Sequence, residues 1–393
     1  MDVAAFRDSP VGQLAPVRGH DAYLGRDYEH FAFVPHPLPS EVPLDGLTIK
    51  LMTEADRAVG RLDAAATRLP NPALLVRPSL YREAVSTSAL EGTYAPFHEV
   101  LAADYLEERK RSAEVREILN YVRAAERGLE LIKERPICLN LIAPLQAIIV
   151  EGTRGDGYDA GQLRTGQVYI GERKLGIERS RFVPPPAGDV LVQGVSDWEK
   201  WINANDHTPL LVKAALGHYQ FETLHPFSDG NGRLGRLIVT LQLVDAGAMR
   251  YPVLNLSPWF EPRKDAYKDA LLAVSRTGDY APWLCFFFEA VMAQAEDAVR
   301  RIEALMTARA EFLEVLREDR ARGVVLEIVE DLIGYPVITP TEAAALHNVT
   351  YPPAARAVSR LERLGILKEI TGSNYGRIYV CERVMRIVEQ PGT

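Results

Sequence analysis

The sequence has few cysteines, no excess of basic residues and no long apolar run. Its three cysteines lie far apart without C-x-x-C spacing, which argues against a disulfide framework or a zinc site and favours the reducing cytoplasm. The 45 basic and 53 acidic side chains give a net charge of -8, so no chain-wide positive field draws the protein to nucleic acid or membrane. We expect no secretory signal at the amino terminus and no membrane span, because the longest apolar segment, residues 280–295, is short and contains Glu289.

Length and periodicity predict several helical domains. The chain has 393 residues with 47% hydrophobic side chains, which is typical of a globular protein larger than one ordinary core. Proline-rich residues 1–46 predict an extended arm. Apolar residues recur every three or four positions, which predicts an N-terminal helical domain at residues 47–127 and a second domain with a connecting helix at residues 128–322. Alternating residues between glycines at 161–174 predict a short hairpin, so the expected fold is all-α with one small β element.

The C-terminal segment, residues 323–393, follows a different pattern. A helix is expected to start at Thr339, and a second one is expected from Thr350 to Gly365. Two strand-like runs then flank a Gly-Ser-Asn turn at residues 372–374. The order of helices followed by a hairpin predicts a winged helix-turn-helix.

Basic side chains on this predicted module are compatible with contacts to DNA phosphates. Three arginines share one face of the second helix, and two more basic residues lie on the wing: Arg356, Arg360, Arg363, Lys368 and Arg377. Glu362 and Glu369 dilute this charge. Dimerisation or protein contact is therefore the alternative role for the module.

The most informative segment is HPFSDGNGRLGR, residues 225–236, which lies between two apolar helical stretches. A helix is expected to begin at Asn231, so the backbone amides of Gly230, Asn231 and Gly232 are placed to bind an anion with help from the helix dipole. Asp229 supplies a carboxylate oxygen beside that anion, a ligand suited to Mg²⁺. The segment therefore predicts a phosphate site with a metal ligand.

Two arginines and a histidine complete this pattern. Arg233 and Arg236 lie on one helix face, where they are able to clamp further phosphates. His225 is the one side chain of the segment whose ordinary pKa lets it take a proton near neutral pH. Each feature alone has a simpler interpretation, namely a structural histidine, a glycine turn or a solvated arginine face. Their joint occurrence in one short segment favours a nucleotide site.

The segment resembles the Fic family signature, H-x-F-x-[DE]-G-N-G-R-x-x-R, at every specified position, and the resemblance extends over residues 45–290. It implies transfer of AMP from ATP, with Mg²⁺, to a Ser, Thr or Tyr hydroxyl of a target protein. In that scheme His225 is the catalytic base, Phe227 anchors the loop and Asp229 holds Mg²⁺. The nucleotide-binding residues that the resemblance implies are Gln220, Asp229, Gly230, Asn231, Gly232, Arg233 and Arg236.

A second segment, REAVSTSALEGT at residues 82–93, predicts the end of a helix, with Gly92 directly after the cap. Glu91 lies at the unfavourable end of the helix dipole, so a cationic partner is expected, although a solvated glutamate is the simpler interpretation. In the Fic family, [ST]-x-x-x-E-[GN] is the inhibitory motif. Thr87 to Gly92 match it, and its place before the main motif resembles the second class. The resemblance implies that Glu91 pairs with Arg236 and restrains the enzyme.

The predicted hairpin at residues 161–174 has two interpretations. Its alternation alone is compatible with a surface ornament. In Fic proteins the corresponding hairpin, the flap, binds the target by adding a strand. The resemblance implies this role for Thr165, Gly166, Gln167, Val168, Tyr169, Ile170 and Gly171.

The segment expected near the adenine departs from the family pattern. Pro262 stands where relatives have an asparagine, and Ala266 precedes Tyr267. We therefore expect an altered base pocket, with ATP as the default nucleotide.

The leading prediction is a protein adenylyltransferase that Glu91 restrains. One alternative is a DNA-binding regulator whose Fic core senses nucleotide. The other is an enzyme that removes AMP from proteins, in which Glu91 would position a water. The expected partners are ATP and an unidentified target protein, with self-modification, a homodimer and DNA binding left open.

Overall fold

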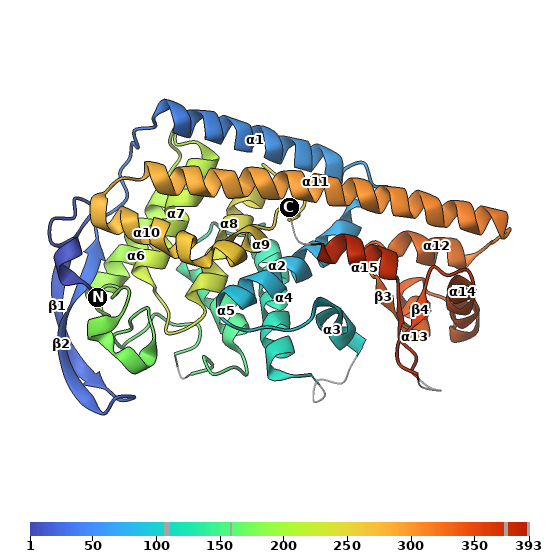
Figure 1. The fold of residues 1–393 in the computed structure, drawn as a ribbon, viewed down its shortest axis with the longest axis horizontal. Coiled ribbons are helices and arrows are strands. Elements are labelled where there is room, and N and C mark those ends of the chain that lie inside the picture. Colours follow the sequence, from blue (N-terminus) through green and yellow to red (C-terminus); the bar gives the residue numbers. More distant parts are fainter. Residues whose placement is uncertain (106–110, 158, 373–375, 391–393) are drawn as a thin grey trace. The chain divides into compact units, whose positions relative to one another are not determined.

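A computed structural model describes residues 1–105, 111–157, 159–372 and 376–390. Helices dominate this part of the chain, and the strands form small antiparallel sheets, so the expected all-α class is confirmed (Figure 1). The α-helices are α1 (Gly46–Ala66), α2 (Val76–Leu90), α3 (Phe97–Ala102), α4 (Ala113–Leu131), α5 (Leu139–Val150), α6 (Asp189–Ile202), α7 (Leu210–Leu224), α8 (Asn231–Asp245), α9 (Ser257–Phe260), α10 (Lys264–Thr277), α11 (Ala281–Glu318), α12 (Val324–Asp331), α13 (Pro340–Leu346), α14 (Tyr351–Arg363) and α15 (Glu382–Glu389).

The strands are β1 (Gly12–Asp21), β2 (Arg26–Pro35), β3 (Val337–Ile338), β4 (Lys368–Glu369) and β5 (Tyr379–Val380). Short 3-10 helices are η1 (Val3–Phe6), η2 (Pro72–Leu75), η3 (Ala103–Tyr105), η5 (Arg173–Leu175), η6 (Ile177–Arg179) and η7 (Glu261–Arg263).

The chain forms two compact units, each assembled from segments that are distant in sequence. Unit 1 comprises Met1–Arg57, Asn120–Gly247 and Trp259–Met292. Unit 2 comprises Ala58–Leu119, Ala248–Pro258 and Ala293–Thr393. Helices α1, α4 and α11 contribute residues to both units.

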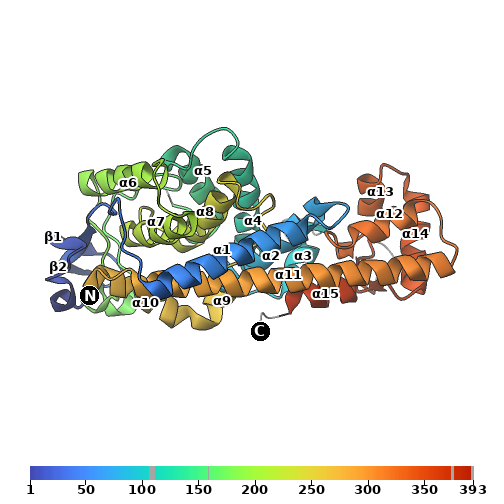
Figure 2. The ribbon, with the colours of Figure 1, turned by 90° about the horizontal axis from the view of Figure 1, so that it is seen from above.

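The core of unit 1 is a bundle in which α7 packs against α6 and α8, and α8 also packs against α5 (Figures 1 and 2). Close approach of α7 and α8 depends on Gly235. A Cβ atom there would lie 2.7 Å from Glu222 Oε1 and 3.2 Å from His218 Cε1. These distances are shorter than van der Waals contact, so a glycine lets the two helices meet.

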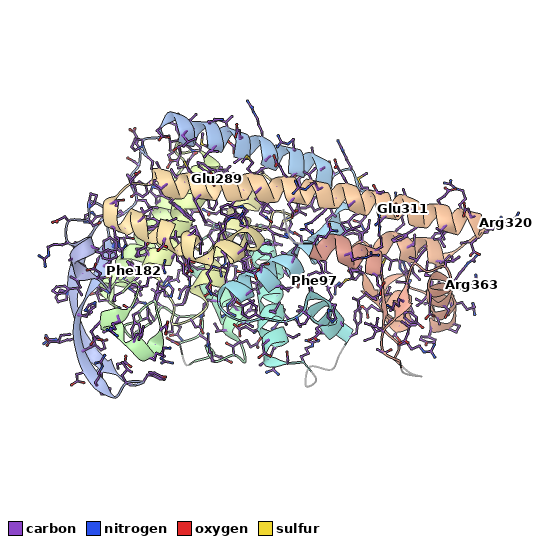
Figure 3. The ribbon with its side chains drawn as sticks, in the orientation of Figure 1. Phe97, Phe182, Glu289, Glu311, Arg320 and Arg363 are labelled. Atoms are coloured by element: carbon purple, nitrogen blue, oxygen red, sulfur yellow. The ribbon has the colours of Figure 1, made fainter. Side chains whose placement is uncertain are left out.

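Residues 1–46, expected as an extended arm, contain the antiparallel hairpin β1–β2, paired from Gly12 opposite Pro35 to Asp21 opposite Arg26. Phe33 of β2 is fully buried, and its ring centroid lies 5.5 Å from Phe6 and 5.9 Å from Phe182. Figure 3 labels Phe182. A two-stranded sheet consists of edge strands, which tolerate the prolines of this segment because each strand pairs on one side only.

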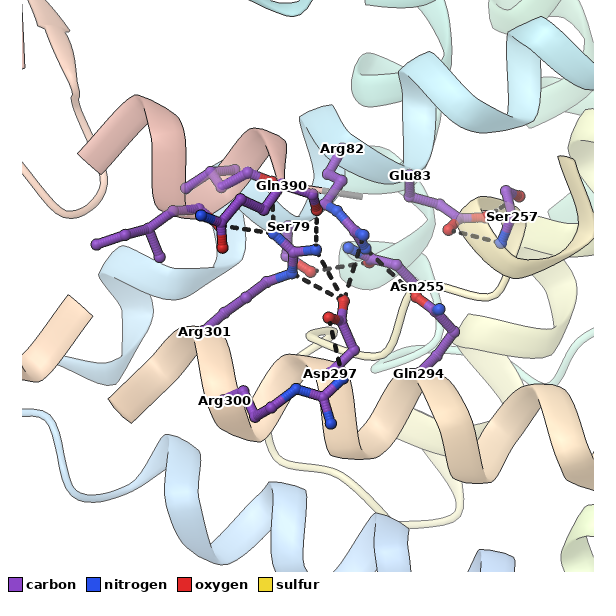
Figure 4. A network of polar contacts seen from close by, with 12 residues as sticks. Ser79, Arg82, Glu83, Asn255, Ser257, Gln294, Asp297, Arg300, Arg301 and Gln390 are labelled. Atoms are coloured by element: carbon purple, nitrogen blue, oxygen red, sulfur yellow. Dashed lines mark hydrogen bonds and ion pairs between the residues drawn. The ribbon is translucent and has the colours of Figure 1, made fainter. Parts of the chain in front are cut away.

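A buried polar network organises unit 2 around Asp297 of α11 (Figure 4). The Asp297 Oδ2 atom accepts from Arg301 Nε at 2.9 Å and lies 3.3 Å from Nη2 of Arg82 on α2. Arg301 Nη1 also donates to the carbonyl oxygens of Ile387 and Val388, at 2.6 and 2.8 Å, near the C-terminal end of α15. Asp297 and Arg301 together therefore link α2, α11 and α15.

The C-terminal segment runs in the order α12, β3, α13, α14, β4, β5, with the strands arranged β3-β5-β4. Thr339 caps α13 by accepting a hydrogen bond from the Glu342 amide at 3.0 Å, which confirms the expected helix start. Thr350 is the N-cap of α14, and Gly365 follows that helix with φ of 74°. Of the turn expected at residues 372–374, residues 373 and 374 lie outside the described residues.

Candidate functional site

The segment HPFSDGNGRLGR forms the loop between α7 and α8 in unit 1 together with the first turns of α8. His225 ends α7 in the left-handed conformation, with φ of 47° and ψ of 61°. Gly230 has φ of 79°, and α8 begins at Asn231, as expected from the sequence. Leu234 donates to the Gly230 carbonyl at 3.0 Å, so the N–H groups that precede Leu234 in α8 lack intrahelical acceptors and their helix end favours an anion.

The Asn231 side chain closes the loop on itself. Its Oδ1 accepts the Phe227 amide at 2.9 Å, and its Nδ2 donates to the Phe227 carbonyl at 2.8 Å. Phe227 is fully buried, so the ring anchors the loop in the core of the unit. The Asn231 side chain thus fixes the loop, while its backbone amide lies at the helix start.

Asp229 lies in the loop directly before Gly230, and its side chain is 36% exposed. Its Oδ1 accepts the Gly230 amide at 2.6 Å and lies 3.8 Å from Nη2 of Arg233. In this structure the Gly230 amide, expected to face an anion, is thus bonded to Asp229. A Cβ on Gly155 would lie 2.5 Å from Asp229 Oδ2, so only a glycine allows the neighbouring loop to approach this carboxylate.

Gln146 of α5 is a site residue that the sequence reasoning missed. It is 2% exposed, donates from Nε2 to the Asp229 carbonyl at 2.9 Å and accepts the Gly161 amide on Oε1 at 2.6 Å. The sequence feature that could have indicated it is a single polar residue within the apolar stretch LIAPLQAIIV of α5. A buried side-chain amide needs partners, which this loop supplies.

The two arginines of the motif are buried rather than solvated. Arg233 is 2% exposed and Arg236 is 3% exposed. This burial excludes the interpretation of a solvated helix face. A buried guanidinium interacts more strongly with an anion than a surface one does, because less water screens the charge.

His218 of α7 is a second residue that the sequence reasoning did not single out. Its Nε2 lies 2.6 Å from the Tyr267 hydroxyl, and its ring stacks on Tyr267 and Trp283. Burial, followed by the positive charge of Arg236, lowers the pKa of His218 to about 3. The side chain is therefore a neutral imidazole at physiological pH.

Tyr267, from the segment expected near the adenine, lies in the core. It is 3% exposed, and its ring stacks on Phe260 with centroids 4.7 Å apart. Gln220 is also buried, and its Nε2 donates to the carbonyl of His36 at 2.9 Å. These contacts place both side chains within the packing of unit 1.

The expected flap, Thr165–Gly171, forms one antiparallel bridge, between Ile170 and Phe182, instead of a hairpin with extended strands. The Gln167 side chain adds hydrogen bonds to this backbone pairing. Gln167 Nε2 donates to the carbonyls of Val168 and Pro184 at 3.0 and 2.9 Å. Thr165 and Gly166 are exposed, whereas residues 167–170 are half-buried.

The expected inhibitory segment ends α2 in unit 2, whereas the main motif belongs to unit 1. Glu91 is the C-cap of α2 and is exposed, and Gly92 follows with φ of 94°, so the predicted helix end is confirmed. Thr87 is fully buried on the same helix.

Among the residues that the structure describes, no group of three or more His, Cys, Asp or Glu side chains is arranged to hold a metal ion. Within the same residues, no helix combines the length and apolar character required to cross a membrane.

The fold and the site define a class of helical proteins built around a helix–loop–helix that presents a histidine next to a glycine-rich helix start. The sequence matches the Fic/DOC family N-terminal domain over residues 49–130 and the Fic/DOC family domain over residues 136–243. Through these two domains the chain belongs to the Fic/DOC family.

The chain is similar to curated proteins over part of its length. The protein adenylyltransferase fic-1 of Caenorhabditis elegans is 33% identical over 158 residues, which cover 39% of this chain and 27% of that protein. The protein adenylyltransferase Fic of Culex quinquefasciatus is 33% identical over 133 residues, which cover 33% of this chain and 23% of that protein. The chain thus spans about a quarter of the length of these relatives.

Solved structures share the fold. A Fic family protein from Desulfovibrio desulfuricans matches with a TM-score of 0.56 and 21% identity, over 88% of this chain and 98% of that one. Fic-1 from C. elegans matches with a TM-score of 0.51 and 22% identity, over 66% of this chain and 74% of that one.

Proposed function

We propose that the protein transfers AMP from ATP to the hydroxyl of a Ser, Thr or Tyr side chain in a target protein. The observation that carries the proposal is the half-buried His225, held at the end of α7 directly before the loop that opens α8. The names of the curated relatives support the same activity. Because His225 is only half-buried, a substrate hydroxyl is able to reach it, as a general base requires.

The proposed reaction is a displacement at the α-phosphorus. The His225 imidazole accepts the proton of the incoming hydroxyl, whose oxygen forms a bond to the α-phosphorus. The bond from that phosphorus to the pyrophosphate oxygen breaks, and pyrophosphate leaves with the electron pair. Such a transfer depends chiefly on positioning and on stabilisation of the phosphate charge.

The start of α8 supplies that stabilisation in the proposal. The amides of Asn231 and Gly232 lie at the positive end of the helix dipole. Arg233 and Arg236 add two buried positive charges within the first turns of the same helix. Together these groups suit a chain of phosphates better than a single small anion.

The residues present also fit a Mg²⁺ ion. Mg²⁺ is usually held by one or two carboxylates together with substrate phosphates, and Asp229 offers one partly exposed carboxylate beside the helix start. When bound, the ion would neutralise part of the phosphate charge. Asp229 would hold it while its Oδ1 keeps the hydrogen bond from the Gly230 amide.

We further propose that Glu91 restrains the enzyme by competing with the γ-phosphate for Arg236, as in Fic proteins of the second class. Its position at the C-cap of α2, where the helix dipole is unfavourable for an anion, supports this role. A guanidinium that engages a carboxylate cannot bind a phosphate fully at the same time.

The exposed part of the segment 165–171 supports a role in binding the target. In this proposal the target pairs with the segment by adding a strand to it. The target hydroxyl would then be presented to His225 by backbone pairing, without a need for a fixed target sequence.

The test uses purified Glu91→Gly protein incubated with labelled ATP and Mg²⁺, followed by intact-mass and peptide mass spectrometry. We expect AMP on Ser, Thr or Tyr residues of the protein itself, at a level at least tenfold above that of the parent. The further change His225→Ala should abolish the label, whereas His207→Ala, at an exposed site outside the motif, should leave it unchanged. A Glu91→Gly protein that takes no label would contradict the proposal. Release of AMP from modified protein would show that the enzyme removes AMP instead of adding it.

The order of elements in residues 323–390 favours a second candidate, a regulator that binds DNA through a winged helix. Arg363 of α14 is exposed (Figure 3). Arg356 of the same helix is exposed as well. Arg360, however, is ion-paired with Asp319 and donates to the Asp319 carbonyl at 2.7 Å. This pairing weakens the positive face, so the enzyme remains our proposal. Duplex DNA binding that falls steeply with added salt would favour the regulator.

A further inference from the structure

Arg164 is a buried arginine between the flap segment and the histidine loop of unit 1. It is 1% exposed, and its guanidinium donates to four backbone carbonyls. The acceptors are His225 O at 2.8 Å, Pro185 O at 2.6 Å, Gly166 O at 3.1 Å and Leu224 O at 3.4 Å. The Arg164 amide donates to Pro226 O at 3.0 Å.

The electrostatics of this position are unusual. Burial lowers the pKa of the Arg164 guanidinium to about 10, so the side chain still carries a full charge at neutral pH. The acceptors that it binds among the described residues are carbonyl oxygens. Two of them, on Leu224 and His225, belong to the C-terminal end of α7, where the helix dipole favours a cation.

These bonds hold a strained backbone. His225 has the left-handed conformation, which is sterically unfavourable for a residue other than glycine. The following Pro226 disfavours a right-handed helical conformation for His225, so the helix must end there. Arg164 binds the carbonyls on both sides of this residue and thereby selects one conformation.

The same guanidinium reaches the flap. Gly166 lies within the segment 165–171, and Pro185 follows Phe182, which forms the bridge to Ile170. One side chain therefore connects the backbone of His225 to the flap segment and to the stretch of chain that follows the residue bridged to it.

We propose that Arg164 is a positioning residue. By holding the backbone of both His225 and the flap, it places the His225 imidazole, the proton acceptor, next to the target hydroxyl. This inference rests on the proposed AMP transfer. A base must lie within hydrogen-bonding distance of its proton, and a displacement of about 1 Å costs on the order of 100-fold in rate. The four carbonyls that the Arg164 guanidinium binds all lie before the start of α8 in the chain, so binding of the phosphates should not depend on it.

The experiment compares Arg164→Lys with its parent, both in the Glu91→Gly background. Lysine keeps the charge but cannot place donors on four carbonyls in the planar pattern of a guanidinium. We expect kcat to fall 10- to 100-fold while KM for ATP changes less than twofold. Arg179→Lys, at an exposed arginine outside the site, is the matched control and should leave both constants unchanged.

A second readout does not depend on turnover. Modification of His225 by diethylpyrocarbonate, followed by peptide mass spectrometry, reports how the imidazole is exposed. We expect its rate to change at least threefold in Arg164→Lys and to stay constant in Arg179→Lys. If the lysine variant does not fold, Arg164→Gln, which removes the buried charge, carries both measurements.

Three results would overturn the inference: a kcat within twofold of the parent, a parallel loss in kcat and in affinity for ATP, or an unchanged modification rate of His225. A parent that never transfers AMP would instead overturn the proposed function. In that case the modification rate still decides whether Arg164 holds the histidine loop.

Discussion

Asn231 binds the backbone of Phe227 twice, through Oδ1 to the amide at 2.9 Å and through Nδ2 to the carbonyl at 2.8 Å. Both residues are buried, so the two hydrogen bonds are shielded from water. The side chain of the first residue of α8 therefore determines the shape of the loop that precedes it. This relationship makes the loop a single rigid element between two helices.

We predict that Asn231→Ala disrupts this loop. The change leaves a buried amide and a buried carbonyl without partners, and each such group costs about 1–3 kcal/mol. We expect the free energy of unfolding to fall by about 2–4 kcal/mol and AMP transfer to be lost. Urea denaturation measures the first effect. Asn140→Ala, at an exposed position on α5, is the control and should change stability by less than about 0.5 kcal/mol.

Gly235→Ala should disturb the packing of α7 on α8. The new methyl group would meet Glu222 Oε1 at 2.7 Å and Phe221 Cδ1 at 3.1 Å, so these side chains must move to admit it. Overpacking of this kind costs about 1–3 kcal/mol. Gly60→Ala is the matched control, because Gly60 lies within α1 with no atom within 4 Å of the added Cβ. There the gain in helix propensity should stabilise the protein by about 0.5–1 kcal/mol. Equal changes in Tm for the two variants would contradict the prediction.

Acid should destabilise the protein in part through His218. The folded state holds the pKa of this imidazole at about 3, against 6.5 for the ordinary side chain. Below pH 6.5 the unfolded chain binds a proton that the folded protein does not. The contribution of His218 is therefore complete above pH 6.5 and is lost as the pH falls from 6.5 toward 3, by up to about 1.4 kcal/mol per pH unit.

The measurement for this prediction is urea denaturation at pH 7, 6 and 5. We expect His218→Gln to lose less free energy of unfolding over this range than the parent does, although it is less stable at pH 7. His207→Gln changes an exposed histidine and should keep the pH dependence of the parent. Parallel pH curves for His218→Gln and the parent would rule out His218 as the source.

Asp297→Ala should destabilise unit 2 strongly. The change leaves Arg82 and Arg301, whose side chains are 10% and 13% exposed, without their shared carboxylate. Removing one partner of a buried ion pair costs about 3–5 kcal/mol. Glu314→Ala on the same helix breaks an exposed pair with Arg317 and should cost less than about 1 kcal/mol. Thermal unfolding compares the two variants, and similar losses would show that the network at Asp297 adds little.

The sequence alone determined the local features of this protein. Spacing and capping residues placed the start of α8 at Asn231, the end of α2 at Glu91 and the start of α13 after Thr339, and the structure confirms all three. The motif also determined the family. These features depend on residues a few positions apart, whose side chains and dihedral angles act on the backbone directly.

Only the tertiary structure revealed which distant residues support the loop. Arg164 and Gln146 bind carbonyls 61 and 83 residues further along the chain, and the sequence does not indicate either of these contacts. The hairpin β1–β2 was likewise missed, because its stability comes from Phe33 packing on Phe6 and Phe182. Hydrophobic packing and burial bring such segments together. The local periodicity of the sequence does not indicate which distant segment each one packs against.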